Sequence, residues 1–328
     1  MKVKAMPVHA ATLSALSGFA EHRRLMIFTF HRVLDVKDPV LPDEPTGRDF
    51  ADQLEWISQF LNVIPLPEAA EQLAAGDLTA RTACVTFDDG YRNNFDVALP
   101  LLRRFGLPAT FFVATGAVAE GAMWNDLIIE SVRHCGSRLD LRPFGFDEYP
   151  IASERDRPRV VDQALEAMKY LPVDERAQRA RDIYRTFCGG DLPSLMMTPE
   201  MLRSLAEQGH DIGAHTVSHP ILAKVDDLRA VDEIRKSRDW LASITGRAPT
   251  SFAYPNGRPG TDFGDRHRVM VREAGFSCAV STTWGCAVRE SDRMALPRFT
   301  PWETTRGGFF TRLVKTYVQS YRPSRFDV

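Results

Sequence analysis

Long apolar runs are missing from this sequence. No stretch of about 18 apolar residues occurs among its 328 residues, so we expect no membrane-spanning helix. The first thirty residues also lack a secretory pattern, because His9 and the charged residues 21–23 interrupt the stretch that follows Lys2 and Lys4. We therefore expect a cytoplasmic protein.

Charge of one sign and paired cysteines are also missing. The formal net charge is -2, which argues against nucleic acid as the main partner. The 5 cysteines are odd in number and scattered, and no CxxC spacing occurs. We expect them to be reduced thiols, in keeping with the predicted cytoplasmic location.

Short apolar runs of strand length alternate with segments of helical periodicity. Strands are expected at residues 25–30, 63–66, 82–87, 109–113, 210–214, 251–254 and 277–281, and helices at 50–61, 68–75, 94–105, 199–208, 225–244 and 266–274. This alternation predicts an α/β fold with a parallel sheet or barrel.

Three further segments surround or interrupt this pattern. Residues 1–24 form an N-terminal extension to the predicted catalytic domain, residues 25–300. From about 121 to 197 the chain carries helix-like segments (126–134, 160–170 and 174–187) and no clear strand, which indicates a helical insertion. Residues 301–328 form an amphipathic, basic tail, interpreted either as a surface helix or as a peripheral contact with a membrane.

An acidic pair and a histidine pair each follow a predicted strand. Asp88 and Asp89 come after residues 82–87, and His215 and His219 come after residues 210–214. Two histidines and one carboxylate are a known ligand set for a divalent metal with open positions. The second carboxylate is then free to act as a base on water. The pattern therefore predicts a metal-dependent hydrolase.

These two motifs resemble the first two signature motifs of the polysaccharide deacetylases, the NodB-homology group of carbohydrate esterase family 4. The resemblance runs from about residue 25 to 297 and implies a distorted, incomplete (β/α) barrel that binds a divalent metal. It assigns Asp88 as the catalytic base and Asp89, His215 and His219 as the metal ligands. Zinc is the expected metal, with cobalt, nickel and manganese as alternatives.

The third family motif is altered here. The segment 252–257 keeps a Pro and a Gly, but Ala253 stands where the family has an Arg that steadies the base. Arg258 is a candidate substitute. Tyr254, Pro255 and Asn256 are expected to line the substrate site, and the backbone N–H of Asn256 to hold the oxyanion.

The family's C-terminal histidine, a general acid, has no counterpart near the end of this chain. His31 ends the first predicted strand, and some family members are circularly permuted with this histidine on that strand. We therefore expect His31 to protonate the leaving amine. Trp284 and Arg298 follow the last strands and are further candidates for the substrate pocket.

The predicted function is hydrolysis of N-acetyl groups on a sugar, oligosaccharide or glycan intermediate. For a cytoplasmic enzyme, the expected substrate is a precursor sugar, an oligosaccharide or a lipid-linked intermediate at the inner membrane face. Two alternatives stay open: removal of another acyl group, such as formyl or O-acetyl, and an inactive glycan-binding module, which the missing third-motif Arg would favour. The sequence indicates neither the substrate length nor the oligomeric state.

Overall fold

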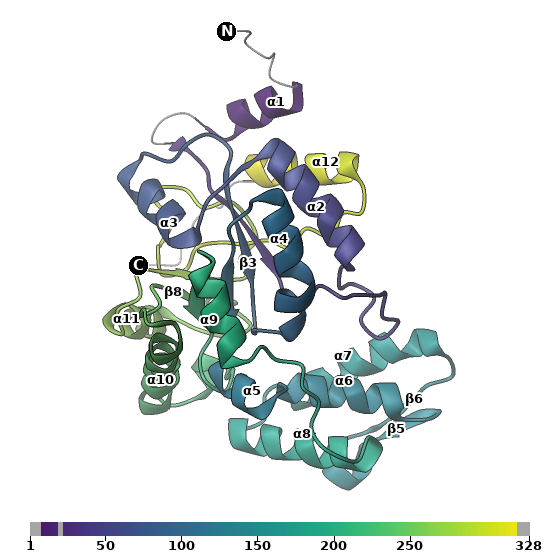
Figure 1. Ribbon diagram of the computed structural model, residues 1–328. Helices are drawn as coiled ribbons and strands as arrows, with labels where there is room; N and C mark the ends of the chain where they lie inside the picture. The colour runs from purple at the N-terminus through teal and green to yellow at the C-terminus, as the bar shows by residue number, and fades with distance from the viewer. Residues whose placement is uncertain (1–7, 19–21, 320–328) are drawn as a thin grey trace.

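A seven-stranded parallel sheet forms the centre of the protein in the computed structural model, which describes residues 8–18 and 22–319 (Figure 1). The strand order is β1-β3-β4-β7-β8-β9, with β2 paired to the start of β3. The strands are β1 (Met26–Phe30), β2 (Asn62–Val63), β3 (Thr82–Phe87), β4 (Thr110–Val113), β7 (Asp211–Ala214), β8 (Ser251–Ala253) and β9 (Cys278–Val280).

An extended segment near residue 298 bridges the two sides of this curled sheet. The Phe299 N–H donates to the Ile27 carbonyl and the Thr29 N–H donates to the Phe299 carbonyl, both at 3.0 Å, which ties the segment to β1. On the other side, the Leu296 N–H donates to the Ala279 carbonyl of β9 at 2.8 Å. The α/β fold with a distorted, incomplete barrel, expected from the sequence, is confirmed.

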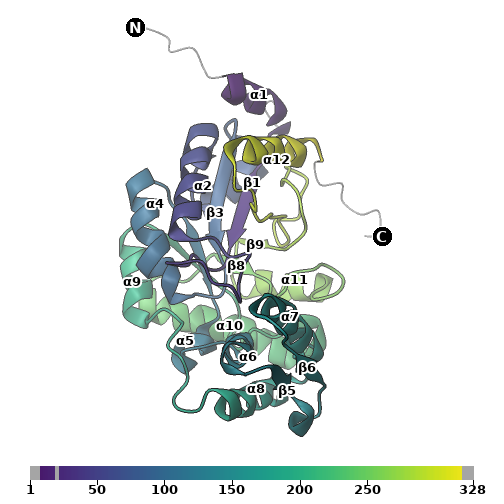
Figure 2. The ribbon, with the colours of Figure 1, turned by 90° about the vertical axis from the view of Figure 1, so that its right-hand side faces the viewer.

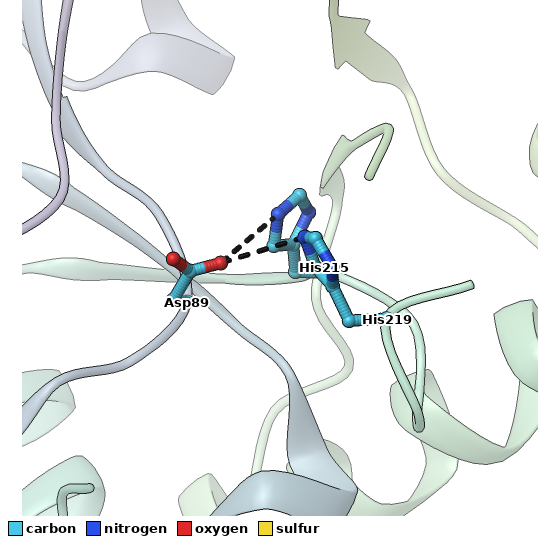
Figure 3. Close-up of side chains that lie close together, drawn as sticks. All are labelled: Asp89, His215 and His219. Atoms are coloured by element: carbon cyan, nitrogen blue, oxygen red, sulfur yellow. Dashed lines mark ion pairs between the residues drawn. The ribbon is translucent and has the colours of Figure 1, made fainter. Parts of the chain in front are cut away.

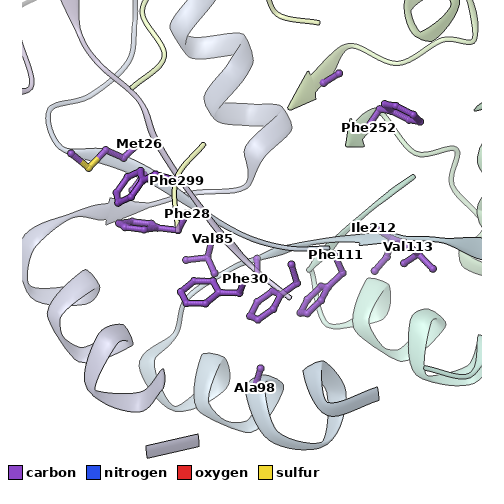
Figure 4. Close-up of a cluster of buried hydrophobic side chains, with 14 of the residues drawn as sticks. Met26, Phe28, Phe30, Val85, Ala98, Phe111, Val113, Ile212, Phe252 and Phe299 are labelled. Carbon is purple, nitrogen blue, oxygen red and sulfur yellow. The ribbon is translucent and has the colours of Figure 1, made fainter. Parts of the chain in front are cut away.

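Helices cover the outside of the sheet. They are α1 (Val8–Leu16), α2 (Gly47–Phe60), α3 (Leu66–Ala75), α4 (Leu99–Phe105), α5 (Thr115–Glu120), α9 (Pro199–Glu207), α10 (Asp227–Thr245), α11 (Asp265–Glu273) and α12 (Arg306–Val318). Under α2, the rings of Phe30, Phe50 and Phe87 pack at centroid distances of 5.1 to 5.7 Å, and Phe111 stacks on Phe87 at 4.9 Å. Figure 4 shows part of this core, which holds the strand ends in place.

The expected helix at 94–105 begins differently from a regular α-helix. Residues Asn94–Ala98 form a π-helical turn, in which the Leu99 N–H donates to the Asn94 carbonyl. Pro100 follows and has no N–H to donate, so the regular hydrogen-bond ladder is interrupted at this point.

The insertion between β4 and β7 contains α6 (Trp124–His134), α7 (Arg157–Met168) and α8 (Val173–Phe187), which pack around their own apolar core (Figure 2). It also contains an antiparallel hairpin, β5 (Arg138–Asp140) and β6 (Glu148–Pro150). The expectation that this region has no strand is therefore wrong. Each strand has three residues, too few to show an alternating pattern.

A buried ion pair attaches the insertion to the end of β1. The Arg32 guanidinium bonds the Asp126 carboxylate near the start of α6. Asp126 also accepts hydrogen bonds from the Tyr91 hydroxyl at 3.1 Å and the Met123 N–H at 2.8 Å. Since Arg32 directly follows His31, this contact seats the insertion beside a candidate catalytic residue.

The described part of the tail is a packed helix. On α12, the Phe309, Leu313 and Tyr317 side chains are fully buried, and the helix contacts α1 and α2. Arg322 and Arg325, which the sequence interpretation included, lie outside the described residues. Within the described ranges, no helix has both the length and the apolar character needed to cross a membrane.

Candidate metal centre and active site

The carboxyl ends of β3 and β7 bring three candidate metal ligands together (Figure 3). Asp89 follows β3, His215 follows β7, and His219 lies in the next turn. Each histidine Nε2 lies 3.5 Å from Asp89 Oδ1, and one donor atom from each residue falls within 4.8 Å of the others. The three side chains thus converge on one point at the edge of the sheet, as the sequence pattern predicted for this edge.

The donor chemistry of this triad fits a divalent metal ion. The His215 Nδ1 lies 2.7 Å from the Ala253 carbonyl, which requires a proton on Nδ1 and leaves the Nε2 lone pair available. Burial, and then the neighbouring His215, lower the pKa of His219 well below its ordinary value and keep its imidazole neutral. Two neutral imidazoles and one carboxylate suit zinc and its neighbours in the first transition series.

The loop that carries the two histidines is held by buried side chains from two helices. The Glu233 carboxylate of α10 accepts hydrogen bonds from the Val217 and Ser218 N–H groups at 2.9 and 2.8 Å. From α8 in the insertion, the Arg176 guanidinium donates to the His219 carbonyl at 3.1 Å. The candidate metal ligands are therefore positioned by both the barrel and the insertion. Neither Glu233 nor Arg176 is predictable from the sequence, because the residues around each form no distinctive local pattern.

Backbone strain is concentrated at this site. Among the described residues, five non-glycine residues have positive φ, and four of them are Asp89 (75°), Thr216 (65°), His219 (52°) and Asn256 (59°). Such conformations cost about 1 to 3 kcal/mol each and persist where the surrounding structure enforces them. The strain thus falls on two candidate metal ligands and on the candidate oxyanion donor.

Asp88 lies beside the triad and is bound by Arg298 in a two-pronged ion pair. Guanidinium nitrogens Nη1 and Nη2 each lie 2.7 Å from one Asp88 oxygen. Nη1 and Nε of Arg298 also contact Thr86 Oγ1 at 3.2 Å and the Ser281 carbonyl at 3.1 Å. Burial alone would raise the pKa of Asp88, but Arg298 and, next, His215 lower it well below the usual range. Asp88 is thus held as a carboxylate in a fixed orientation.

Arg298 makes the contact with Asp88 that the family resemblance assigns to the third-motif arginine, which is missing at position 253. From the sequence, Arg298 is expected in the substrate pocket and Arg258 is the candidate substitute. The Arg298 side chain is fully buried against Asp88, whereas Arg258 is exposed. The two partners are 210 residues apart, and only the segment that closes the barrel brings them together. No local pattern could have indicated this pair.

The other candidate residues fall into two groups. His31 is exposed and lines a cavity of about 550 Å³, while Asn256 and His219 line a second cavity of about 590 Å³. The Asn256 N–H has no hydrogen-bond partner in the described part of the chain, so it is available to an oxyanion. The end of β1 leads to His31, the end of β3 leads to Asp88, and the end of β7 leads to the histidine pair, so these residues gather at one edge of the sheet.

Tyr254 and Trp284, which we expected to line the substrate pocket, line neither of these two cavities. The Tyr254 side chain is buried and its ring stacks on Phe263 at 3.6 Å, so it belongs to the core. Pro255, also buried, forms the turn that leads to Asn256. Trp284 packs on Trp302 at a centroid distance of 5.6 Å, and it is Trp302 that lines the cavity beside His31.

One family model and several curated proteins match parts of this chain. A polysaccharide deacetylase family model matches residues 75–279. The putative polysaccharide deacetylase YxkH of Bacillus subtilis is 19% identical over 277 residues, which cover 84% of this chain and 70% of that protein. Shorter matches span between 4% and 22% of three other curated proteins.

Two solved structures share the fold. Streptococcus pyogenes deacetylase PplD, in complex with acetate, matches with a TM-score of 0.60 and 17% identity over 90% of this chain and 99% of that chain. IcaB from Ammonifex degensii matches with a TM-score of 0.56 and 19% identity over 88% and 97%. At this level of identity, the similarity is one of fold.

Proposed function

From the premise that the chain belongs to the polysaccharide deacetylase family, we propose that it is a metal-dependent hydrolase that removes N-acetyl groups from an amino sugar within an oligosaccharide or glycan intermediate. The observation that carries this proposal is the pairing of the Asp89, His215 and His219 triad with an Asp88 carboxylate held by Arg298. The triad suits a metal, and Asp88 is left free of metal ligation to act on water.

The chemistry divides among the chain's own residues. A divalent metal, zinc in our proposal, held by Asp89, His215 and His219 would supply Lewis acidity. Asp88, ionised and fixed by Arg298, takes a proton from the water whose oxygen attacks the amide carbon. The Asn256 N–H faces the resulting oxyanion.

Cleavage of the carbon–nitrogen bond needs a proton on the leaving nitrogen. His31 is exposed at the end of β1, beside Asp88, and is the residue that we propose as the donor. The products are acetate and the free amine of the sugar. His31→Gln should therefore keep its metal and lose turnover, and full turnover in this variant would remove His31 from the mechanism.

An inactive glycan-binding module is a weaker alternative. The absence of an arginine at position 253 was the feature of the sequence that favoured it. Arg298 now supplies a guanidinium to Asp88, so the base keeps its partner from another part of the chain. Removal of a formyl or O-acetyl group would use the same residues. Assays with substrates that carry each acyl group distinguish these reactions from N-deacetylation.

The test is acetate release from N-acetylated oligosaccharides and from a simple acetyl ester. We expect release by the metal-loaded protein, none after chelation, and a loss of at least about a hundredfold in Asp88→Asn, as removal of a catalytic base implies. Asp77→Asn, an exposed aspartate outside the site, is the matched control and should retain full activity. Metal binding without release from any acylated sugar would count against the proposal.

A further inference from the structure

The cavity beside His31 has features that the reaction itself does not use. It has a volume of about 550 Å³ and lies between the start of α2, the loop that precedes it and residues 300–304. His31 forms part of its wall, so the cavity adjoins the residue that we propose as the proton donor. A pocket of this size accommodates a sugar residue or a larger ligand.

One wall of the cavity contains a buried acceptor without a donor. Gln53 is 4% exposed, and its Nε2 donates to the Pro301 carbonyl at 2.9 Å. This bond fixes which end of the amide carries the oxygen. That oxygen, Oε1, has no hydrogen-bond partner among the described residues. A buried acceptor in this state is stabilised by a ligand that donates a hydrogen bond.

The charged groups in the same wall are mostly carboxylates. Asp43 and Glu44 line the cavity, and within the described ranges neither forms an ion pair with a lysine or arginine. Burial raises the pKa of Glu44, although His31, Arg32 and a hydrogen bond from the Arg32 N–H act in the opposite direction. Lys37, the cationic residue of the wall, donates its ammonium protons to the Pro42 carbonyl. The cavity therefore favours a ligand that is cationic and rich in donors.

An exposed tryptophan stands at the rim. Trp302 is 58% exposed, and one face of its indole stacks on Trp284 at an interplanar angle of 29°. The backing by Trp284 holds the ring in place while leaving much of its surface open. Aromatic faces of this kind bind the apolar face of a sugar ring and attract an adjacent cation.

We propose that this cavity binds a protonated amino-sugar residue, with its ammonium group on Gln53 Oε1 and the Asp43 and Glu44 carboxylates and its ring against Trp302. This proposal rests on the proposed function, which produces such amines. The bound residue has two sources: the released product, or a neighbour in a glycan that is already partly deacetylated. In the second case the enzyme prefers an acetylated sugar next to a free amine, and deacetylation spreads along the chain.

Disaccharides separate these cases. We would measure kcat/KM for acetate release from N,N′-diacetylchitobiose and from its two mono-N-acetylated forms, below pH 7 so that the amine is charged. If the neighbouring residue occupies the cavity, one mono-acetylated form should have a kcat/KM about tenfold higher than that of the diacetylated disaccharide, given the strength of charge-assisted hydrogen bonds. Gln53→Met and Asp43→Asn should move this ratio toward one, and Asp52→Asn, an exposed acid on α2 outside the cavity, should leave it unchanged.

Binding of glucosamine, measured by calorimetry with the metal-loaded protein, tests the product as the source. Binding that weakens in Gln53→Met and Trp302→Ala supports the proposal even when the disaccharide ratio is one. A ratio of one together with no glucosamine binding, or with binding that is equal in all variants, overturns it. Acetate release from the diacetylated substrate in the same assay shows separately whether the proposed function holds.

Discussion

Asp88 shows how one residue can be buried and still charged. Its carboxylate lies inside the protein, where a charge without a partner would be costly, and the Arg298 fork supplies two charge-assisted hydrogen bonds of 2.7 Å. A lysine would offer a single point of contact in place of this planar fork. The orientation of this carboxylate is therefore a property of Arg298 as much as of Asp88.

Replacing Arg298 with methionine should destabilise the protein in a pH-dependent way. In the wild type, the lowered pKa of Asp88 contributes stability above the ordinary carboxyl pKa, and this contribution is lost as the pH falls toward the folded-state value. In Arg298→Met, burial without a cation raises the pKa of Asp88, so the variant regains stability as Asp88 takes up a proton. The difference in unfolding free energy should be about 3 to 5 kcal/mol near pH 7 and should shrink on acidification.

Urea unfolding of both metal-free proteins at several pH values between about 4 and 7 measures this difference, over the range where a carboxyl group changes charge. Arg298→Lys should recover part of the stability, since it restores the charge, but less of the activity, since it does not restore the fork. A difference that stays constant with pH would mean that the loss comes from packing and not from the charge of Asp88.

Arg176 connects the insertion to the candidate metal centre. It is 3% exposed, donates to the carbonyls of Lys169 and His219 at 3.1 Å each, and lies 4.6 Å from the Trp124 ring centroid. Arg176→Met should weaken metal affinity by about tenfold or more, because partners that orient metal ligands have effects of this size. Competition with a chromophoric chelator measures the affinity directly.

The control for Arg176 is Arg185→Met, which removes an exposed arginine from the same helix. Its metal affinity should equal that of the wild type. Melting of the metal-free proteins distinguishes a local effect from general unfolding. If Arg176→Met melts like the wild type and still binds metal as tightly, the insertion does not support the metal site.

At the scale of elements, the sequence predicted most strands and helices, and the misses have physical causes. Apolar runs such as residues 82–87 are buried over their whole length and were easy to recognise. The β5–β6 hairpin was missed because three-residue strands carry no periodic signal. The triad of Asp89, His215 and His219 was predictable because these residues follow strands. The pairing of Arg298 with Asp88 was not, because it depends on how distant parts of the chain pack together.

The attachment of the insertion gives a prediction about an element. Asp126→Asn removes the charge that faces buried Arg32 and should lower the unfolding free energy by about 3 to 5 kcal/mol, because it leaves an uncompensated buried guanidinium. Limited proteolysis should then cut the insertion faster. Asp174→Asn breaks an exposed ion pair between α8 and Arg229 of α10 and should cost about 0 to 1 kcal/mol. Equal losses in the two variants would contradict this account.

At the scale of the whole molecule, the active site depends on both ends of the described chain. His31 comes from the first strand of the sheet, and Arg298 comes from the segment that bridges β9 to β1. The residues that follow this segment include Trp302 at the cavity rim and then α12. A cytoplasmic location and peripheral membrane contact stay predictions. The packing of α12, however, assigns its apolar side to the protein core.

This packing predicts that the C-terminal helix contributes to global stability. Leu313 is fully buried between α12 and the barrel, so Leu313→Ala should cost about 2 to 5 kcal/mol, as for other buried leucines. Val318→Ala, on the same helix but 65% exposed, should stay within about 0.5 kcal/mol of the wild type. Urea unfolding followed by circular dichroism measures both. A small cost for Leu313→Ala would mean that α12 is a detached amphipathic tail whose apolar face is available to a membrane, whereas a large cost makes it part of the structure that closes the barrel and places Arg298 on Asp88.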